Sequence, residues 1–402
     1  MARVLYLVHR IPYPPNQGVK VRSYHLLRHL AERHEVLLGT FVDDPDDLQH
    51  VPTLNRWCTE VKAVPLQPLR ARVTSLAGLL RGEPLTLAYY RHAAMQAWVQ
   101  GLRDRGDIDA VVVFSSSMVP YSAGFEVPVL VDFVDIDSAK WAEYARNRPW
   151  PLSWLYAREG RTLLAYEQAV ARAATRAFLV TQQEVDLFER LAPGVAGHVQ
   201  AVGNGVDAEF FAPDPTLPSP FGADELPLVF TGAMDYWPNV DAVSWFVAEM
   251  LPALRQRWPA LCFHIVGRSP TPAVKALAGP HVNVTGTVPD VRPYLQHAAA
   301  IVAPLRLARG VQNKVLEAMA MARPVVAARS CASVLDATPG VHLAAAETPA
   351  DYVNEVARLL ADAAAAQHMG AAARACVLQH YAWSARLGGL DTFLPPPTPH
   401  AH

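Results

Sequence analysis

Residues 306–326 read "RLARGVQNKVLEAMAMARPVV" and mark the passage from a loop into a helix. The stretch holds three cations around one glycine, followed by a single glutamate: Arg306, Arg309 and Lys314, then Gly310 and Glu317. A helix that begins at a glycine flanked by positive charge favours an anion, because its unpaired N–H groups and its dipole both attract negative charge. The alternative is a solvated basic turn before a core helix, which is the default for a charge run in isolation.

Short apolar runs alternate with helical patterns on both sides of this stretch. Runs such as "RVLYLV", "AVVVFSS" and "PVLVDFVD" are apolar throughout, as expected for strands covered on both faces in a parallel sheet. The same alternation restarts with "LVFTGA", "CFHIVG" and "AAIVAPL". We therefore predict an α/β protein with two Rossmann-like domains that face each other across an interdomain cleft.

A non-periodic stretch rich in Pro, Gly and Asp separates the two halves. At 402 residues the chain is too long for one ordinary core, which supports two domains. We expect an N-terminal domain at 1–205, a linker at 206–226 and a C-terminal domain at 227–385. Residues 386–402 end in "PPPTPHAH" and are expected to form a largely disordered tail.

Bulk composition excludes several classes of protein. Hydrophobic residues make up 51% of the chain and charged residues 18%, which excludes a disordered protein. The net charge of -2 gives no overall attraction to nucleic acid, so any polyanion site must be local. Four scattered cysteines without metal-ligand spacing indicate reduced thiols. With no apolar stretch of about 20 residues and no signal peptide, we expect a cytoplasmic protein, soluble or peripheral on a membrane.

Several glycines follow strand-like runs and are expected near the cleft. Gly18 leads into a helix after the first run, where backbone N–H groups can approach an anion, although a simple chain turn explains it equally well. Gly232, Gly267 and Gly286 follow later runs in the same way. Because no G-x-G-x-x-G follows the first strand, a dinucleotide-binding dehydrogenase is disfavoured.

Five pieces of the sequence carry a resemblance to a known family. They are "NGVD", "LVFTGAMDYWPN", "FHIVG", "VTGTVPDVRPYL" and "KVLEAMAMARPVV", which occur in this order between residues 204 and 326. The sequence resembles a retaining GT-B glycosyltransferase of glycosyltransferase family 4. With "VDFVDIDSAKW" and "GVQNKVLEAMA", it is also similar to a narrower branch of sugar transferases associated with PEP-CTERM/exosortase exopolysaccharide systems.

The resemblance implies transfer of a sugar from a nucleotide-diphosphate donor to an acceptor hydroxyl, with no metal and no further cofactor. The N-terminal domain would bind the acceptor and the C-terminal domain the donor. Cations and helix N-termini must then stabilise the departing diphosphate. The family pattern places its phosphate contacts at Arg306, Arg309, Gly310 and Lys314, with Gly18 opposite. Arg309 and Lys314 are the expected catalytic cations, and Glu317 would hold the donor ribose.

The chain departs from the family pattern at several positions. Arg309 stands where a first glutamate usually contacts the transferred sugar. Either the sugar is recognised by the Gly310–Asn313 backbone and Gln312, with Asn313 in the same site, or the donor specificity is unusual. Two cations that often follow the first strand of the second domain are replaced by Ala233 and Asn239. Ala322 replaces a frequent glycine, and we expect this to change only packing. We also expect Gly232 to lie beside the donor, and the backbone of Gly286, Thr287 and Val288 to bind its base.

The family histidine of the first domain has no clear match here. "VDFVDIDSAKW" offers Asp135, Asp137 and Ser138 in that region, and an aspartate could orient a sugar hydroxyl or accept the acceptor's proton. A turn cap is an equal explanation for Asp137 and Ser138, so Asp135 is the expected catalytic residue. A metal site at these aspartates is disfavoured because the resemblance implies metal-independent transfer.

Residues 62–105 interleave basic side chains with leucines and aromatic residues and contain few acids. Such a segment can lie on an anionic membrane, and many members of the family use lipid-linked acceptors. Packing of an amphipathic helix on its own domain is the alternative. We expect a glycan or lipid-linked acceptor and peripheral contact with the inner face of the plasma membrane.

Two other functions fit parts of the sequence. A GT-B-shaped nucleotide-sugar epimerase would share the fold but turn over donor without acceptor. A non-catalytic nucleotide-sugar binding protein would explain Arg309 in place of a glutamate. The sequence does not name the donor sugar, its base or the acceptor.

Overall fold

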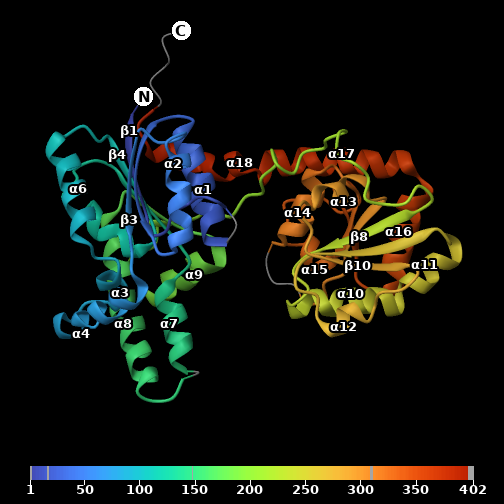
Figure 1. The fold of residues 1–402 in the computed structure, drawn as a ribbon, viewed down its shortest axis with the longest axis horizontal. Helices are drawn as coiled ribbons and strands as arrows, with labels where there is room; N and C mark the ends of the chain where they lie inside the picture. The colour runs from blue at the N-terminus through green and yellow to red at the C-terminus, as the bar shows by residue number, and fades with distance from the viewer. Residues whose placement is uncertain (1, 16–17, 147, 308–310, 397–402) are drawn as a thin grey trace, which may run out of the picture. The chain divides into compact units, whose positions relative to one another are not determined.

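The computed structural model describes residues 2–15, 18–146, 148–307 and 311–396 (Figure 1). The chain divides into two compact units. Unit 1 comprises residues 1–204 together with 386–402, and unit 2 comprises residues 205–385. Each unit is a parallel β-sheet with its own hydrophobic core and with helices packed around it.

Unit 1 contains a seven-stranded sheet in the order β3-β2-β1-β4-β5-β6-β7, and every pairing is parallel. The central strands are almost fully buried, which explains why their sequences are apolar without alternation. Its strands are β1 (Arg3–Val8), β2 (Glu35–Val42), β3 (Glu60–Pro65), β4 (Ala110–Phe114), β5 (Val129–Val134), β6 (Arg176–Leu179) and β7 (Val199–Ala201).

The helices of unit 1 connect these strands and cover the sheet. Helices α7 and α8 pack together as an antiparallel hairpin that extends beyond the sheet (Figure 1). The helices are α1 (Gly18–Ala31), η1 (Pro45–His50), α2 (Val51–Leu54), α3 (Pro68–Ser75), α4 (Ala77–Arg81), α5 (Leu85–Tyr89), α6 (Ala93–Arg105), η2 (Ser116–Ser122), α7 (Asp137–Arg146), α8 (Leu152–Ala173), α9 (Gln182–Leu191) and, near the C-terminus, η3 (Gly388–Phe393). The boundary between the two units falls within α18 (Trp383–Leu387).

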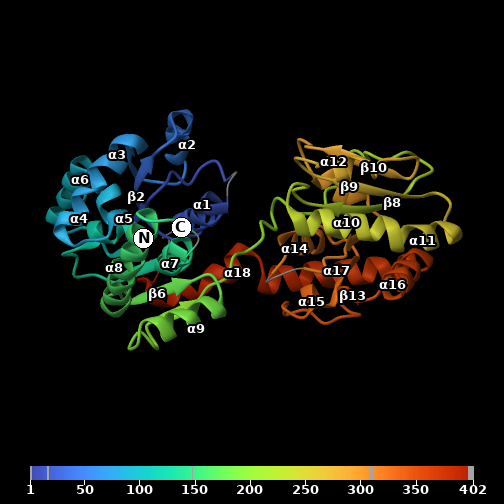
Figure 2. The same ribbon diagram turned by 90° about the horizontal axis from the view of Figure 1, so that it is seen from below.

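Unit 2 repeats the architecture with a six-stranded parallel sheet in the order β10-β9-β8-β11-β12-β13 (Figure 2). Its strands are β8 (Leu226–Thr231), β9 (Leu261–Val266), β10 (Val282–Gly286), β11 (Ala300–Ala303), β12 (Val325–Ala328) and β13 (Ala344–Ala346). Its helices are α10 (Trp237–Glu249), α11 (Leu251–Arg257), α12 (Pro272–Lys275), α13 (Arg292–His297), α14 (Asn313–Ala320), α15 (Arg329–Ala332), α16 (Pro349–Ala361) and α17 (Ala363–His380).

Both sheets reverse their strand order once. In unit 1 the reversal falls between β1 and β4, and in unit 2 between β8 and β11. Open parallel sheets bind ligands outside the carboxyl ends of the strands at such a switch point. The loops that follow β1 and β4, and those that follow β8 and β11, are therefore where the chemistry of each unit is expected.

Two segments differ from their expected roles. Residues 206–226, predicted as a linker, belong to unit 2: Val206 and Ala208 are buried in its core, and the Val206 N–H donates to the Tyr381 carbonyl at 2.8 Å. Within the expected tail, η3 (Gly388–Phe393) packs on unit 1, where the Asp391 carboxylate lies 2.8 Å from His29 Nε2. Burial and pairing of these side chains override the Pro-rich composition.

Within the same ranges of the chain, no helix combines the length and apolar character needed to cross a bilayer. The four cysteines carry free thiols.

Candidate functional site

The candidate site of unit 2 begins at Gly232, directly after β8. This glycine has φ +156, and a Cβ placed on it would lie 2.7 Å from Asn239 Nδ2 and 2.9 Å from Lys314 Nζ. A Cβ on Gly267, after β9, would overlap the Gly232 carbonyl oxygen. The two strand ends can therefore approach each other, and approach Lys314, only because both positions lack a side chain.

Asn239 and Lys314 join the two sides of the switch point. The Lys314 ammonium, on α14 after β11, donates to Asn239 Oδ1, and Asn239 Nδ2 donates to the Ala233 carbonyl at 2.8 Å. The ammonium also lies 4.2 Å from the centroid of the Phe230 ring, a cation–π distance. Asn239, which replaces a family cation, thus holds the remaining cation beside Gly232.

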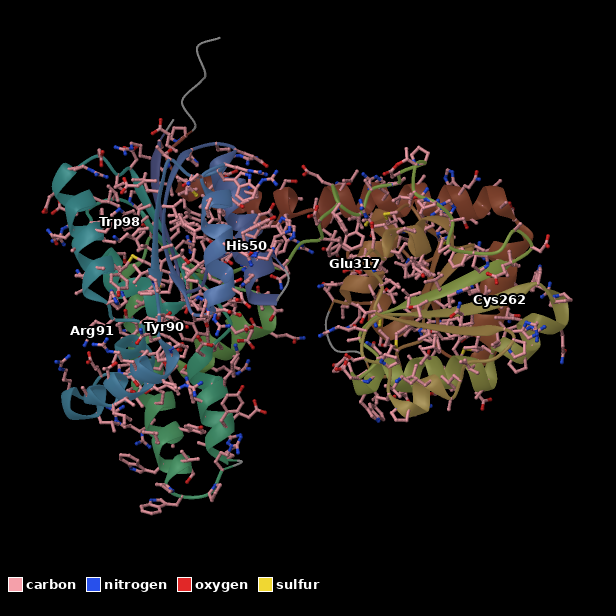
Figure 3. All side chains as sticks on the ribbon, viewed as in Figure 1. His50, Tyr90, Arg91, Trp98, Cys262 and Glu317 are labelled. Carbon is pink, nitrogen blue, oxygen red and sulfur yellow. The ribbon has the colours of Figure 1, made fainter. Side chains whose placement is uncertain are left out.

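Lys314 and Glu317 share one face of α14, three residues apart, and their environment moves both pKa values toward neutrality (Figure 3 labels Glu317). Burial lowers the pKa of the Lys314 ammonium to about 8, while the charge of Glu317 opposes that shift. Burial raises the pKa of the Glu317 carboxyl to about 7, against the influence of Lys314. Among the described residues, Glu317 forms no ion pair. Near neutral pH the pair offers an ammonium for an anion and a carboxylate for hydroxyl groups.

Arg306 lies in the loop that follows β11, and its side chain contacts α10, the helix that carries Asn239. Its Nε donates to Asp241 Oδ2 at 2.9 Å, and its guanidinium stacks over Trp245 with 5.0 Å to the ring centroid. The predicted phosphate contact is thus committed to an ion pair in this structure. Arg309 and Gly310 lie outside the described residues.

The remaining predicted donor contacts occupy two places. Gln312 is the N-cap residue of α14 and Asn313 its first residue, so both stand at the helix start beside Lys314. Gly286 ends β10 with φ +70, and its carbonyl accepts from the Gly267 N–H at 3.2 Å. Thr287 and Val288 follow directly, with Thr287 exposed. These backbone groups line the carboxyl ends of β9 and β10, beyond the switch point.

The predicted residues of unit 1 are Gly18 and Asp135. Gly18 begins α1. Asp135 follows β5, and its carboxylate pairs with Lys140 Nζ at 2.8 Å, while Asp137 lies 3.3 Å from the same ammonium. The pKa of Asp137 is raised by burial, which the charge of Lys140 only partly offsets. Ser138 donates to the buried Glu167 at 2.5 Å, which is a structural role.

A cavity of about 790 Å³ in unit 1 was not expected from the sequence. It lies at the switch point, because His9 follows β1 and Ser115 and Ser117 follow β4. Its other lining residues are mostly aromatic or charged and include Tyr89, Tyr90, Asp137, Lys140, Trp141, Tyr144 and Tyr156. They come from α5, α7 and α8, so only packing brings them together. In the sequence, only the adjacent aromatic pair Tyr89-Tyr90, within residues 62–105, hinted at this aromatic cluster.

His9 forms part of the cavity wall. Its ring stacks on Phe114 with centroids 5.8 Å apart, and Nδ1 is buried without a partner among the described residues. Burial lowers the pKa of His9 to about 4, so the imidazole is neutral at physiological pH. A neutral imidazole has one N–H donor and one acceptor nitrogen, so His9 can form a hydrogen bond with a hydroxyl group of a ligand.

Among the residues that the structure describes, no group of His, Cys, Asp and Glu side chains has the arrangement of a metal site. Asp132, the first aspartate of "VDFVDIDSAKW", is buried in an ion pair with Arg22, with 2.7 Å between Arg22 Nε and Asp132 Oδ2. It is a structural residue.

Comparison with known proteins bears on both units. Residues 225–362 match the family model described as Glycosyl transferases group 1. No curated protein matches the chain in sequence.

Solved structures match the whole chain. HepE of Anabaena in complex with UDP is 15% identical, covers 97% of this chain and 98% of that chain, and gives a TM-score of 0.61. A sucrose-phosphate synthase from Thermosynechococcus elongatus is 18% identical over 98% of each chain, with a TM-score of 0.59. WaaG, a glycosyltransferase involved in lipopolysaccharide biosynthesis, is 16% identical, covers 97% of this chain and 99% of that chain, and gives a TM-score of 0.58. The chain therefore has the GT-B fold, and its second unit carries, over residues 225–362, a domain that matches the group 1 glycosyl transferases.

Proposed function

We propose that this protein is a retaining, metal-independent glycosyltransferase that moves a sugar from a nucleotide-diphosphate donor to an acceptor hydroxyl. The observation that carries the proposal is the arrangement of Gly232, Asn239, Lys314 and Glu317 at the switch point of unit 2. It lies inside the region that matches the group 1 glycosyl transferases. An ammonium and a helix start suit a diphosphate, and a carboxylate three residues away suits a ribose diol.

Stabilisation of the leaving diphosphate is the chemical task of unit 2. Negative charge grows on the diphosphate as the glycosidic bond breaks, so a cation beside it lowers the barrier more than it strengthens ground-state binding. Lys314 is placed for this role by Asn239 and by the bare backbone at Gly232. Arg309 and Gly310 are proposed to complete the phosphate contacts, and Arg306 to join them on release from Asp241.

The acceptor is proposed to bind in the aromatic cavity of unit 1. Aromatic faces suit the C–H surfaces of a sugar ring, while His9, Asp137 and Lys140 offer hydrogen bonds to its hydroxyl groups. Asp135, joined to this cavity through Lys140, is proposed to orient the reacting hydroxyl or accept its proton.

Two of the matched structures bear on donor and pathway. HepE was crystallised with UDP and with UDP-glucose, which makes uridine diphosphate donors the first to test. WaaG acts in lipopolysaccharide biosynthesis. We propose a role in bacterial exopolysaccharide or cell-surface glycan synthesis, in the cytoplasm at the inner face of the plasma membrane, with PEP-CTERM/exosortase systems as the narrower assignment.

Thermal unfolding with UDP-, GDP-, ADP- and dTDP-sugars tests donor binding, because a ligand of the native state raises its stability. We expect one donor class to raise the midpoint equally in the wild type and in the control Lys275→Ala, an exposed residue of α12, and to raise it less in Lys314→Ala. No stabilisation by any donor would contradict the proposal.

Turnover assays separate the remaining possibilities. Transfer to an acceptor, unaffected by a chelator and with retained anomeric configuration in the product, supports the proposal. Donor isomerisation without acceptor would indicate an epimerase, and donor binding without any turnover would indicate a binding protein.

A further inference from the structure

Unit 1 exposes a concentration of large apolar side chains on two neighbouring elements. On α3 and the turn after it, Leu69 is 78% exposed and Val73 70% exposed, and their spacing with Leu76 places all three on one helix face. At the tip of the α7–α8 hairpin, Trp150 is 81% exposed. We call the set the docking surface; its apolar members are Leu69, Val73, Leu76, Tyr144, Trp150, Leu152 and Trp154.

The two elements face the same cavity. Leu76 from the end of α3, Tyr144 from α7 and Leu152 from α8 all line the aromatic cavity of unit 1. In Figure 1, α3, α4, α7 and α8 lie together at one end of that unit. The docking surface therefore has two parts, α3 and the hairpin tip, and both parts border this cavity.

Four exposed arginines lie beside the apolar side chains of this surface. The exposed side chains of Arg70 and Arg72 flank Leu69 and Val73, and those of Arg146 and Arg148 flank Trp150. None of the four forms an ion pair among the described residues. Residues 66–82 contain no acid, and neither does the hairpin tip from 144 to 157. Exposed Trp and Leu with unpaired arginines are the composition of a face that lies in an anionic lipid interface.

The hairpin tip is also built for low desolvation cost. Trp150 stands between Pro149 and Pro151, and neither proline has an N–H group that must leave water. Their fixed φ angles limit the conformations of the loop, so less entropy is lost on insertion.

We propose that the docking surface binds the surface of a membrane rich in anionic phospholipid, with Trp150 and Trp154 in the interface and the arginines on the headgroups. The surface takes in part of the 62–105 segment expected to contact a membrane and adds the α7–α8 hairpin. Binding itself does not depend on the proposed function. If that function also holds, the acceptor cavity opens at the lipid surface, and the acceptor class is a lipid-linked glycan.

Co-sedimentation of the full chain with phospholipid vesicles tests the proposal. We expect binding to vesicles of phosphatidylcholine mixed with phosphatidylglycerol, and little binding to phosphatidylcholine alone. Trp150→Ala with Trp154→Ala should weaken partitioning about tenfold. Arg70→Glu with Arg72→Glu, and separately Arg146→Glu with Arg148→Glu, should each weaken it by at least about fivefold per arginine.

Matched controls lie outside the docking surface. Trp237→Ala removes an aromatic side chain that is 59% exposed, against 54% for Trp154. Arg56→Glu with Lys275→Glu reverses two exposed charges away from the surface. Both controls should bind vesicles like the wild type. Because the altered side chains are exposed, thermal unfolding should be unchanged, and the charge reversals keep the test valid if the tryptophan variant folds poorly.

Three outcomes would overturn the proposal. They are equal binding to both vesicle types, no binding to either, and binding that the surface variants and the controls weaken equally. Sedimentation of a wild-type dimer that dissociates in the tryptophan variant, without vesicle binding, would assign the surface to a second copy of the chain.

Discussion

At the scale of single residues, the site depends on one lysine and the amide that holds it. Asn239 stands where the resemblance expects a cation, yet its Oδ1 accepts from Lys314 and its Nδ2 is tied to Ala233. The ammonium is thereby fixed beside Gly232, partly out of water, where its charge acts on an anion more strongly than at the surface. The residue that replaces the expected cation, Asn239, therefore also holds the Lys314 ammonium in position.

Truncation of Lys314 should mainly lower kcat, whereas truncation of Glu317 should mainly weaken donor binding. Lys314→Ala removes a charge that acts mainly in the transition state, so kcat should fall about 10²–10³-fold with a smaller change in donor affinity. Glu317→Ala removes hydrogen bonds to the ribose and should weaken donor binding by about 1.5–3 kcal/mol. Steady-state kinetics and calorimetry measure the two effects. Equal and negligible effects would count against both roles.

The pH dependence of donor binding follows from the same two groups. Affinity should rise as Glu317 ionises through its pKa of about 7 and fall as Lys314 loses its proton through a pKa of about 8. Glu317→Gln should remove the acidic limb and Lys314→Arg the alkaline limb. Calorimetric titrations across this range check the prediction, and a profile unchanged in both variants would contradict it.

The free energy of unfolding should also depend on pH through the ionisation of Glu317. The folded protein keeps the Glu317 proton up to pH about 7, whereas the unfolded chain releases it near the ordinary value of 4.5. The contribution of this group therefore weakens folding as pH rises between these values. In urea unfolding experiments, the free energy of unfolding should fall less across this pH interval in Glu317→Gln than in the wild type. An identical slope in the variant would contradict the raised pKa.

At the scale of elements, two backbone positions set the geometry of the site. Gly232 follows β8 and has no room for a Cβ, and Ala322 follows α14 with φ +54. The sequence suggested only a packing change at Ala322, where the family often has glycine. The structure instead shows a left-handed residue at the end of the helix that carries Lys314 and Glu317.

Gly232→Ala should disrupt the site by a steric clash. A Cβ there would press on Asn239 and Lys314. We expect donor affinity to fall about tenfold or more, and stability to fall by about 1–3 kcal/mol from the strained backbone. Gly279→Ala is the matched control, because a Cβ at Gly279 meets nothing within 4 Å. Similar behaviour of both variants would show that Gly232 is not constrained.

Ala322→Gly should stabilise unit 2. An L-residue in the left-handed region costs about 1–2 kcal/mol, and the greater freedom of glycine in the unfolded chain offsets part of the gain. A net increase of about 0.5–1 kcal/mol in the free energy of unfolding is expected, measured with urea. Ala276→Gly, at φ -67, should have the opposite sign.

Local pattern predicted the elements well where neighbouring residues determine them. Continuous apolar runs predicted two parallel sheets, and that prediction is confirmed. The aromatic cavity of unit 1 escaped prediction because its walls come from the loops after β1 and β4 and from α3, α5, α7 and α8, which only tertiary packing brings together. Arg306 illustrates the same limit, since its partner Asp241 lies 65 positions away in the chain.

At the scale of the whole molecule, each unit presents its polar groups at the point where its strand order reverses. Unit 2 offers a cation and a carboxylate there, and unit 1 an aromatic cavity with a neutral histidine. The proposed donor and acceptor chemistry would thereby be divided between two similar folds. The order of η3 against unit 1 shows that composition alone misjudged the C-terminal segment, because the Asp391 and His29 pairing is not visible in sequence.

Calorimetric titration of UDP, GDP, ADP and dTDP into the full chain tests most directly whether unit 2 holds a nucleotide diphosphate through Lys314. The account predicts binding of at least one of the four, weakened about tenfold in Lys314→Ala and retained in Lys275→Ala. Absence of binding for all four, or equal affinity in Lys314→Ala and the wild type, would contradict it.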